Sequence, residues 1–328
     1  MPRQPPEAPA SGITTGVKPL SFDGRVAVVT GAGRGIGRAY AMLLAERGAG
    51  VVVNDLGGSM EGDGADEEPA SAVAAEIAAA GGNAVADGSD VATVEGAQNL
   101  VDTATERFGR LDILINNAGI MRWAGFPELD VENLERHLAV HVFGSFNTTR
   151  AAWPHMVGQR YGRIIMTTST GMFGLPNNTS YATAKAALIG LTRSIKTAGT
   201  RHGIKANCIA PAAFTRMAGR PHPFRQGDEA GTDNLQATQM AAELVAPMAA
   251  FLAHEDCPVS GEIYVAGAGR FARIFIASTE GYVHVGAGPT IEDVAAHWAT
   301  INDETGYYLP PDLVAWSRAF MAHLNPNG

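Results

Sequence analysis

The chain has 328 residues, 46% hydrophobic and 17% charged, with a formal net charge of −9. This length and composition can bury a large core without disulfides, and the acidic balance argues against a nucleic-acid-binding surface, which is usually basic. The two cysteines, Cys208 and Cys257, are too few for a disulfide framework and lack metal-ligand spacing. We therefore expect no metal, and a reducing compartment such as the cytoplasm. No apolar run reaches the ~18 residues of a membrane span, so no membrane partner is expected.

The pattern along the chain predicts an α/β fold. Residues 1–20 are rich in proline and small residues and are predicted to form a disordered arm. Residues 21–269 alternate apolar strands with helical segments, as in a Rossmann-like, doubly wound parallel sheet of about seven strands with helices on both faces. Strands are expected at 25–30, 50–55, 83–87, 111–116, 161–168, 204–210 and 261–265. Helices are expected at about 35–48, 69–80, 93–108, 130–156, 179–201 and 237–253.

A glycine-rich turn between a strand and a helix is the first candidate site. Val26–Thr30 is a β-branched apolar run typical of a buried parallel strand. Gly31, Gly33, Gly35 and Gly37 follow, and a helical pattern begins within this run. Because glycines allow close backbone approach and a helix N-terminus favours negative charge, the turn predicts a pyrophosphate site.

An acidic residue stands where a dinucleotide-binding fold needs one. Asp55 ends the next apolar run, twenty residues after Gly35. Its carboxylate can accept hydrogen bonds from both adenosine ribose hydroxyls and would repel a 2′-phosphate, so it predicts NAD rather than NADP. Arg34 instead favours NADP, because a basic residue at this position can bind the 2′-phosphate. The acidic insertion 57–69 is either a solvated loop or a flap over the adenosine.

Two later segments can border the same nucleotide. Asp90 and Val91 follow the third strand and are placed to contact the adenine, although Asp90 is also a candidate helix N-cap. Asn116, Asn117 and Gly119 lie where the fourth strand ends. Their amides can face the cofactor or brace the sheet, and for Asn116 we favour the structural role.

Tyr181 and Lys185 are the candidate acid–base pair. Four residues apart on a predicted helix, they share one face, and an ammonium near a phenol favours phenolate. A run of hydroxyl residues, 167–170, ends the preceding strand, about a dozen residues before the tyrosine. Such hydroxyls suit polarisation of a carbonyl beside a nicotinamide. Tyrosine and lysine at this spacing also occur on ordinary exposed helix faces.

Five motifs together resemble the short-chain dehydrogenase/reductase family over about residues 21–268. They are T-G-A-G-R-G-I-G (30–37), D-V (90–91), N-N-A-G (116–119), Y-A-T-A-K (181–185) and I-A-P-A (209–212). The resemblance implies an oxidoreductase with a nicotinamide cofactor. The cofactor contacts that it implies are Gly31, Arg34, Gly35, Ile36, Gly37, Asp55, Asp90, Val91, Asn117, Ala118, Gly119, Tyr181, Lys185, Pro211 and Thr215.

The resemblance also implies catalytic roles. Tyr181 is expected to be the acid–base, and Lys185 to hold the nicotinamide ribose and lower the tyrosine pKa. The family's usual relay asparagine is His141 here, so a relay through its backbone carbonyl is expected. An ungapped match places Thr168 at the position of the family's catalytic serine, with Ser169 as the alternative hydroxyl if the strand end shifts by one residue.

Further motifs, including V-V-V-N-D-L-G-G (51–58) and Y-G-R-I-I-M-T (161–167), resemble the branch of the family that oxidises (3R)-hydroxyacyl-CoA with NAD. The expected reaction interconverts a secondary alcohol and a ketone, as in a 3-hydroxyacyl-CoA dehydrogenase or ketoreductase. A steroid or terpenoid alcohol dehydrogenase is the enzymatic alternative. A nucleotide-sensing binding protein without turnover is the rival from another class.

Two segments depart from the alternating pattern. Residues 212–236 form a long polar stretch expected to be an active-site lid, whose arginines, Arg216, Arg220 and Arg225, solvate the loop or meet the phosphates of an acyl-CoA. Residues 270–328 are expected to pack on the domain or at a subunit interface. The family resemblance implies a homodimer or homotetramer that associates through the helices at about 130–156 and 179–201. A hairpin is expected from 273–278 and 282–285, and helices at 291–300 and 311–324.

Overall fold

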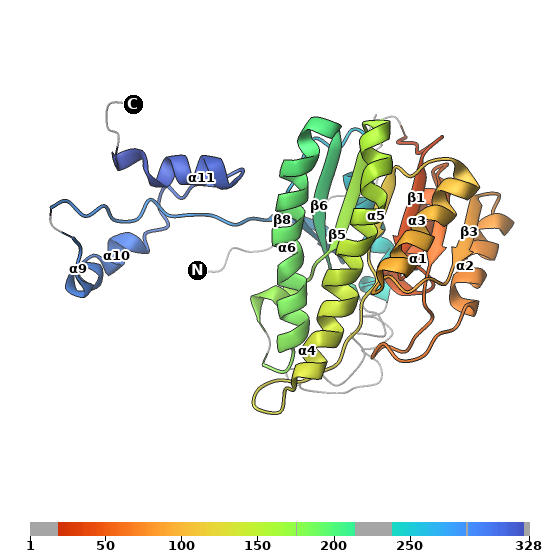
Figure 1. Ribbon diagram of the computed structural model, residues 1–328, viewed down its shortest axis with the longest axis horizontal. Coiled ribbons are helices and arrows are strands. Elements are labelled where there is room, and N and C mark those ends of the chain that lie inside the picture. Colours follow the sequence, from red (N-terminus) through yellow and green to blue (C-terminus); the bar gives the residue numbers. More distant parts are fainter. Residues whose placement is uncertain (1–18, 175, 214–237, 287, 325–328) are drawn as a thin grey trace.

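A computed structural model describes residues 19–174, 176–213, 238–286 and 288–324, and the described chain contains an eight-stranded sheet ordered β3-β2-β1-β4-β5-β6-β7-β8 (Figure 1). All neighbours pair in parallel except β7 and β8. The predicted α/β doubly wound fold is confirmed. The strands are β1 Val26–Thr30, β2 Gly50–Asn54, β3 Asn83–Asp87, β4 Ile113–Asn116, β5 Gly162–Thr167, β6 Ile204–Pro211, β7 Ile263–Gly267 and β8 Arg270–Ile274.

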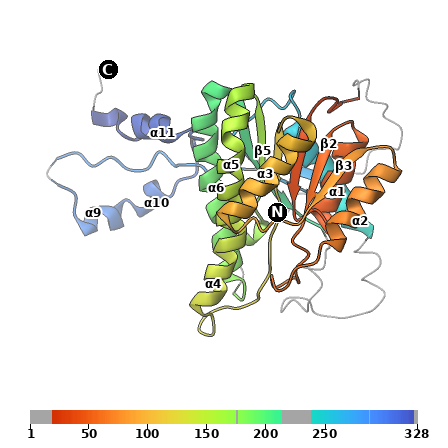
Figure 2. The ribbon, with the colours of Figure 1, turned by 45° about the vertical axis from the view of Figure 1, so that its right-hand side comes forward.

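Helices cover both faces of the sheet (Figures 1 and 2). Side chains of α1, α2 and α8 share one buried cluster with the strands, and those of α3, α5 and α6 share the other. The helices of the domain are α1 Gly35–Glu46, α2 Glu68–Ala79, α3 Val94–Phe108, α4 Val131–His137, α5 Gly144–Gln159, α6 Thr179–Gly199 and α8 Ala246–Ala253.

The chain order reverses at β1, which pairs with β2 on one side and β4 on the other. The residues of β1 are all buried, as its apolar β-branched sequence predicts. In an open parallel sheet the crevice for a ligand opens at such a reversal, beyond the carboxyl ends of the strands. The glycine turn after β1 and Asp55 after β2 both lie at that edge.

The long helix expected over 130–156 is interrupted in its middle. A π-helical turn, Leu138–Phe143, joins α4 to α5. Such turns are rare and occur mostly at functional sites. The helix expected over 237–253 is likewise broken, because within its described part a 3₁₀ turn at Ala242–Leu244 precedes α8.

The expected hairpin of 273–278 with 282–285 is wrong. Instead β8 pairs antiparallel with β7, and the turn is Ala268-Gly269, with φ of 50° and 72°. Positive φ at both central residues gives a two-residue turn whose twist matches the twist of the two flanking strands. Residues 282–285 form no strand. In the described part of the chain beyond β8, an isolated β-bridge joins Ser278 to Tyr308.

The rest of the C-terminal segment, residues 275–324, forms an arm that extends away from the domain past α6 (Figure 1). It carries α9 Ile291–Ala296, α10 Trp298–Ile301 and α11 Leu313–Phe320, shorter than the two helices expected there. A hydrogen bond from the Arg193 guanidinium to the Pro310 carbonyl, 2.5 Å, ties the arm to α6. None of the residues in these three helices is buried in the described chain.

Candidate active site

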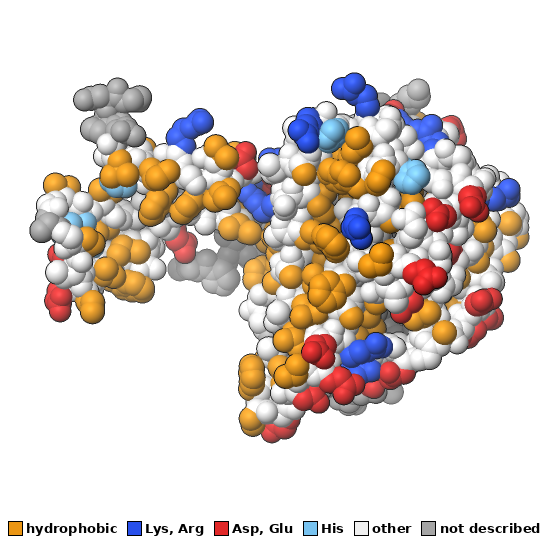
Figure 3. All heavy atoms as spheres, viewed as in Figure 1, with side chains coloured by type: hydrophobic (Ala, Val, Ile, Leu, Met, Phe, Trp, Pro, Cys, Tyr) orange, Lys and Arg blue, Asp and Glu red, His pale blue; other side chains and the backbone are white. Residues whose placement is uncertain are grey.

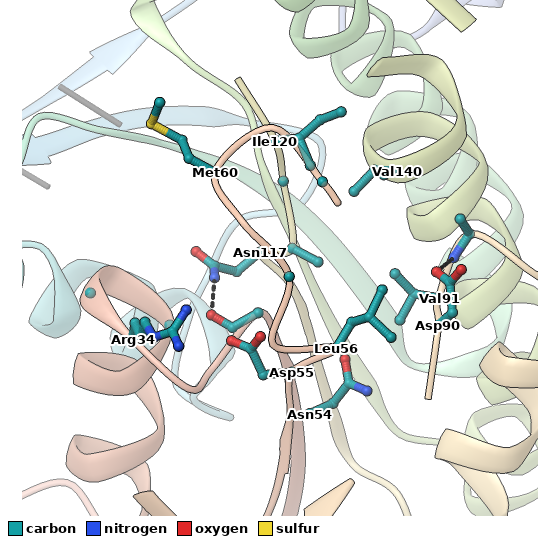
Figure 4. Close-up of a pocket in the computed structure, with 18 of the residues that line it drawn as sticks. Arg34, Asn54, Asp55, Leu56, Met60, Asp90, Val91, Asn117, Ile120 and Val140 are labelled. Atoms are coloured by element: carbon teal, nitrogen blue, oxygen red, sulfur yellow. Dashed lines mark hydrogen bonds between the residues drawn. The ribbon is translucent and has the colours of Figure 1, made fainter. Parts of the chain in front are cut away.

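A pocket of about 350 Å³ lies at the carboxyl ends of β1, β2 and β4 (Figure 4). Its walls come from the glycine turn, the end of β2, the β3–α3 turn and the segment after β4. The structure brings together here these predicted cofactor residues: Gly31, Arg34, Gly35, Ile36, Gly37, Asp55, Asp90, Val91, Asn117, Ala118 and Gly119.

The glycine turn is built for an anion. Helix α1 begins at Gly35, and no described side chain caps its amides. A Cβ on Gly37 would lie 2.2 Å from the Gly31 carbonyl oxygen, so only glycine allows the turn to pack this tightly. Uncapped N–H groups at a helix N-terminus attract negative charge. These residues therefore fit the pyrophosphate of a dinucleotide.

Asp55 is held rigidly at the pocket wall. The Gly33 N–H donates to Asp55 Oδ2 at 2.8 Å, and the Gly57 N–H donates to Oδ1 at 2.7 Å. Each carboxylate oxygen keeps a further acceptor site, because an ionised carboxylate has about four. The group can therefore still accept hydrogen bonds from ribose hydroxyls.

The other candidate residues at this edge divide into lining and bracing groups. Asp90 lines the pocket, but it is not the N-cap of α3; Thr93 is, accepting from the Gly96 N–H at 2.9 Å. Asn116 is buried and accepts from the Thr148 hydroxyl at 2.7 Å, so its side chain has the structural role.

Asn117 has both a lining and a structural role. It lines the pocket, and its amide donates to the carbonyls of Thr30 and Gly31 at 3.0 and 3.1 Å. It thereby ties the glycine turn to the end of β4.

Tyr181, Lys185, Ser169 and His141 meet beside this pocket. Tyr181 lies in the first turn of α6, and the Ser169 side chain hydrogen-bonds its hydroxyl. The ring centroids of His141 and Tyr181 are 5.4 Å apart, and Lys185 Nζ is 5.5 Å from the tyrosine ring centroid. His141 also contacts the pocket wall, because its Nε2 is 3.0 Å from the Ile120 carbonyl oxygen.

The Thr168 hydroxyl is turned away from this centre, which corrects the ungapped match. Thr168 is fully buried and donates to the Lys185 carbonyl at 2.7 Å. Ser169, one residue later, contacts Tyr181 instead. The physical reason is that β5 ends at Thr167, and successive side chains there point to opposite sides.

The model of the short chain dehydrogenase family matches residues 25–222. This chain belongs to the short-chain dehydrogenase family.

Similar proteins align with this chain over most of its length. A protein of Mycobacterium tuberculosis, named as a short-chain type dehydrogenase/reductase, is 42% identical over 86% of this chain and 95% of its own length. The peroxisomal multifunctional enzyme type 2 of Drosophila melanogaster is 41% identical over 87% of this chain. The dehydrogenase spans about half of that enzyme, with 46% of its length aligned.

Solved structures of the family resemble this dehydrogenase as well. The full-length Drosophila enzyme matches with a TM-score of 0.75 and 33% identity, over 94% of this chain and 50% of that one. A 7α-hydroxysteroid dehydrogenase in complex with NADH and 7-oxo glycochenodeoxycholic acid matches with a TM-score of 0.66 and 31% identity. That alignment covers 76% of this chain and 95% of the other.

Burial shifts the pKa values of the candidate acid–base pair, Tyr181 and Lys185. Burial raises the pKa of Tyr181, and the hydrogen bond from Ser169 opposes this rise. Burial lowers the pKa of Lys185 to about 7, while its Nζ donates to the Thr167 carbonyl at 2.6 Å. In the free protein, burial therefore raises the tyrosine pKa overall, and the lowering of this pKa by Lys185 stays a prediction.

Sequence reasoning missed His137. It is fully buried, and its ring stacks on that of His141 with centroids 5.8 Å apart. Burial lowers the pKa of both imidazoles, so both are neutral at pH 7. The available signal was the spacing of four residues, which places both histidines on one helix face.

The His141 backbone carbonyl, the expected relay acceptor, receives a hydrogen bond from the Ser145 hydroxyl at 2.6 Å. A carbonyl has a second lone pair, so this bond leaves the relay possible.

Pro211, a further cofactor candidate, ends β6 at the same edge of the sheet but does not line the pocket. Thr215 and the lid arginines lie outside the described residues. Within the described chain, no three His, Cys, Asp or Glu side chains are arranged to hold a metal ion. No helix of this part of the chain is long and apolar enough to cross a membrane.

The lysine pKa predicts how stability depends on pH. Between the folded pKa of about 7 and the ordinary value of 10.5, the unfolded chain holds a proton that folded Lys185 has lost. Stability therefore increases with pH across this window, and the full cost of the buried ammonium remains below it. We expect Lys185→Met to gain stability relative to the wild type more at pH 6 than at pH 9, measured by urea unfolding without nucleotide.

Lys196→Met, on the same helix, is the control, since Lys196 is near the surface. If the free energies of unfolding of Lys185→Met and the wild type differ by the same amount at both pH values, the lowered pKa of Lys185 is contradicted.

Proposed function

We propose that this chain is an NAD-dependent dehydrogenase that interconverts a 3-hydroxyacyl-CoA and the corresponding 3-ketoacyl-CoA. The observation that carries the proposal is the connection between the pocket and the acid–base centre. His141 contacts Ile120 of the pocket wall on one side and the Tyr181 ring on the other. A Cβ on Gly119 would lie 2.6 Å from His141 Cε1, so the two parts are in direct contact.

The chain's own groups suit proton transfer to and from a hydroxyl. Tyr181 exchanges the hydroxyl proton of the substrate. The single Ser169 O–H donates to the Tyr181 oxygen in the free protein and to the substrate oxygen once the substrate is bound. Lys185 holds the nicotinamide ribose and passes protons from Tyr181 towards the His141 carbonyl. A bound nicotinamide dinucleotide supplies or accepts the hydride.

NAD is favoured over NADP by Asp55. Its carboxylate is fixed by the Gly33 and Gly57 amides at the position where the adenosine ribose would lie. A 2′-phosphate there would meet a negative charge at short range. The solved 7α-hydroxysteroid dehydrogenase holds NADH, which supports the same choice.

The acyl-CoA substrate rests on likeness to the Drosophila multifunctional enzyme and on the motifs of the 3-hydroxyacyl-CoA branch. A steroid alcohol is the second candidate, favoured by the bile-acid ligand of the hydroxysteroid dehydrogenase. The cytoplasm is our proposed location, because both cysteines are free thiols, although several relatives have peroxisomal names.

A panel assay tests the function. We expect NAD-dependent oxidation of (3R)-hydroxyacyl-CoA thioesters, followed by nicotinamide absorbance, to exceed that of steroid alcohols. Asp55→Ala should reduce the preference for NAD because it removes the repulsion of a 2′-phosphate. Turnover of steroids alone would favour the second candidate, and NAD binding without any turnover would favour a nucleotide-sensing protein.

Substitution of the two hydroxyl residues tests the catalytic assignment. We expect Ser169→Ala to lower kcat/KM on the order of 100-fold, as for loss of an oxyanion-type donor. It should also move the tyrosine-dependent limb of the pH–rate profile to higher pH, because the hydrogen bond that lowers the Tyr181 pKa is removed.

Thr168→Val is the matched control. It should cost about 1–3 kcal/mol of stability by leaving the Lys185 carbonyl without its donor, with little change in kcat/KM. A dead Thr168→Val beside a fully active Ser169→Ala would return the role to Thr168.

The proposal includes a homo-oligomer in which a second copy covers the arm. Trp298, Leu313, Val314 and Phe320 are each more than 60% exposed, and hydrophobic side chains gather along the arm and over the neighbouring helices (Figure 3). Burying one such side chain stabilises by ~1.5–3 kcal/mol, so a contiguous exposed set favours association.

Light scattering tests the oligomer. We expect a mass above that of the monomer at micromolar concentration, and a shift to the monomer in Leu313→Asp/Val314→Asp. Val94→Asp is the control, because Val94 is 61% exposed but lies on α3 of the domain. A monomeric wild type would contradict the proposal.

A further inference from the structure

The acidic insertion after β2 is an ordered loop, which we call the β2–α2 flap (residues 56–66). The Asp66 N–H donates to the Leu56 carbonyl at 2.9 Å and closes the base of the flap. Gly57 has φ of 77°, and a Cβ there would lie 1.8 Å from the Asp66 carbonyl oxygen. Within the flap, the Ser59 N–H donates a hydrogen bond to the Asp63 carbonyl at 2.8 Å. The flap therefore has a defined shape of its own.

The tip of the flap is fastened to the opposite side of the pocket. The Met121 N–H donates to the Met60 carbonyl at 2.9 Å, and Arg122 Nε donates to the Glu61 carbonyl at 2.7 Å. Arg122 also pairs with the Asp63 carboxylate at 2.9 Å. These bonds connect a segment after β2 to a segment after β4.

A second arginine holds the tip to α4. The Arg136 guanidinium donates to the Gly62 carbonyl at 2.7 Å. A charged donor makes a stronger hydrogen bond to a carbonyl than a neutral one does. The exposed Asp63 contributes less, because surface ion pairs are weak.

The flap lies over the dinucleotide pocket. Leu56, Ser59 and Met60 of the flap line this pocket together with Ile120 and Val140. Figure 4 shows Leu56 directed towards Val91, next to Asp55. A dinucleotide in the pocket is therefore enclosed between the glycine turn and a loop that the two arginines hold in place.

We propose that Arg122 and Arg136 latch the β2–α2 flap over the bound dinucleotide and thereby set its rate of dissociation. Arg122 does not line the pocket and is a positioning residue that acts through the flap, whereas Arg136 holds the flap and also lines the pocket. The inference rests on the proposed function, since it requires that the pocket binds the dinucleotide. The inference extends the proposed function, because it gives a role to Arg122 and Arg136, which belong to none of the sequence motifs.

The test is the dissociation rate of NADH from the intact protein, measured by stopped-flow fluorescence with excess NAD as the trap. We expect Arg122→Ala to increase the rate about 10-fold, the effect of losing an interaction near 1.4 kcal/mol. Arg136→Ala should increase it as well, and Arg122→Lys should restore part of the slow dissociation. Asp63→Asn should change it less, because the bond to the Glu61 carbonyl remains.

Arg38→Ala is the matched control. Arg38 also pairs with a surface carboxylate, Glu76, but it touches no part of the flap. Its NADH dissociation rate should equal that of the wild type. Equal rates in the wild type, Arg122→Ala and Arg136→Ala, with ordinary NADH affinity, would overturn the latch while leaving the proposed function intact.

Failure of the wild type to bind NADH would overturn both proposals. If Arg122→Ala unfolds, the comparison of Arg136→Ala with Arg122→Lys still decides the matter.

Discussion

The candidate active site is held together by a pair of hydrogen bonds that join the end of β5 to α6. Lys185 Nζ donates to the Thr167 carbonyl, and the Thr168 hydroxyl donates back to the Lys185 carbonyl. Both bonds are buried, where a lost partner costs most. They tie the end of β5 to α6, whose first turn carries Tyr181, and Ser169 follows directly after the tied residues.

This arrangement has an electrostatic cost. Lys185 is enclosed by protein, and its pKa falls to about 7 because burial disfavours the ammonium. The Tyr181 phenol is enclosed as well, and burial raises its pKa. In the free protein, the Ser169 hydrogen bond is the interaction that favours the phenolate. A centre tuned by burial in this way is typical of functional sites.

The pocket and the catalytic centre are built from segments far apart in the sequence. The π-helical turn between α4 and α5 carries His141, which contacts both Ile120 and Tyr181. The segment after β4 also receives the β2–α2 flap through Arg122. The loop that follows β4 therefore lies between the flap and the acid–base centre.

The sequence by itself determined the parts that depend on local pattern. β-Branched runs, a glycine turn and the spacing of Tyr181 and Lys185 reveal strands, a tight loop and a shared helix face, and the fold inferred from them is confirmed. Only the tertiary structure decided which hydroxyl meets Tyr181, where the insertion after Asp55 docks and which strand pairs with β7. Each of these depends on contacts with distant segments: a one-residue difference at a strand end reverses the direction of a side chain, and an acidic loop has the same composition whether it is solvated or held by two arginines.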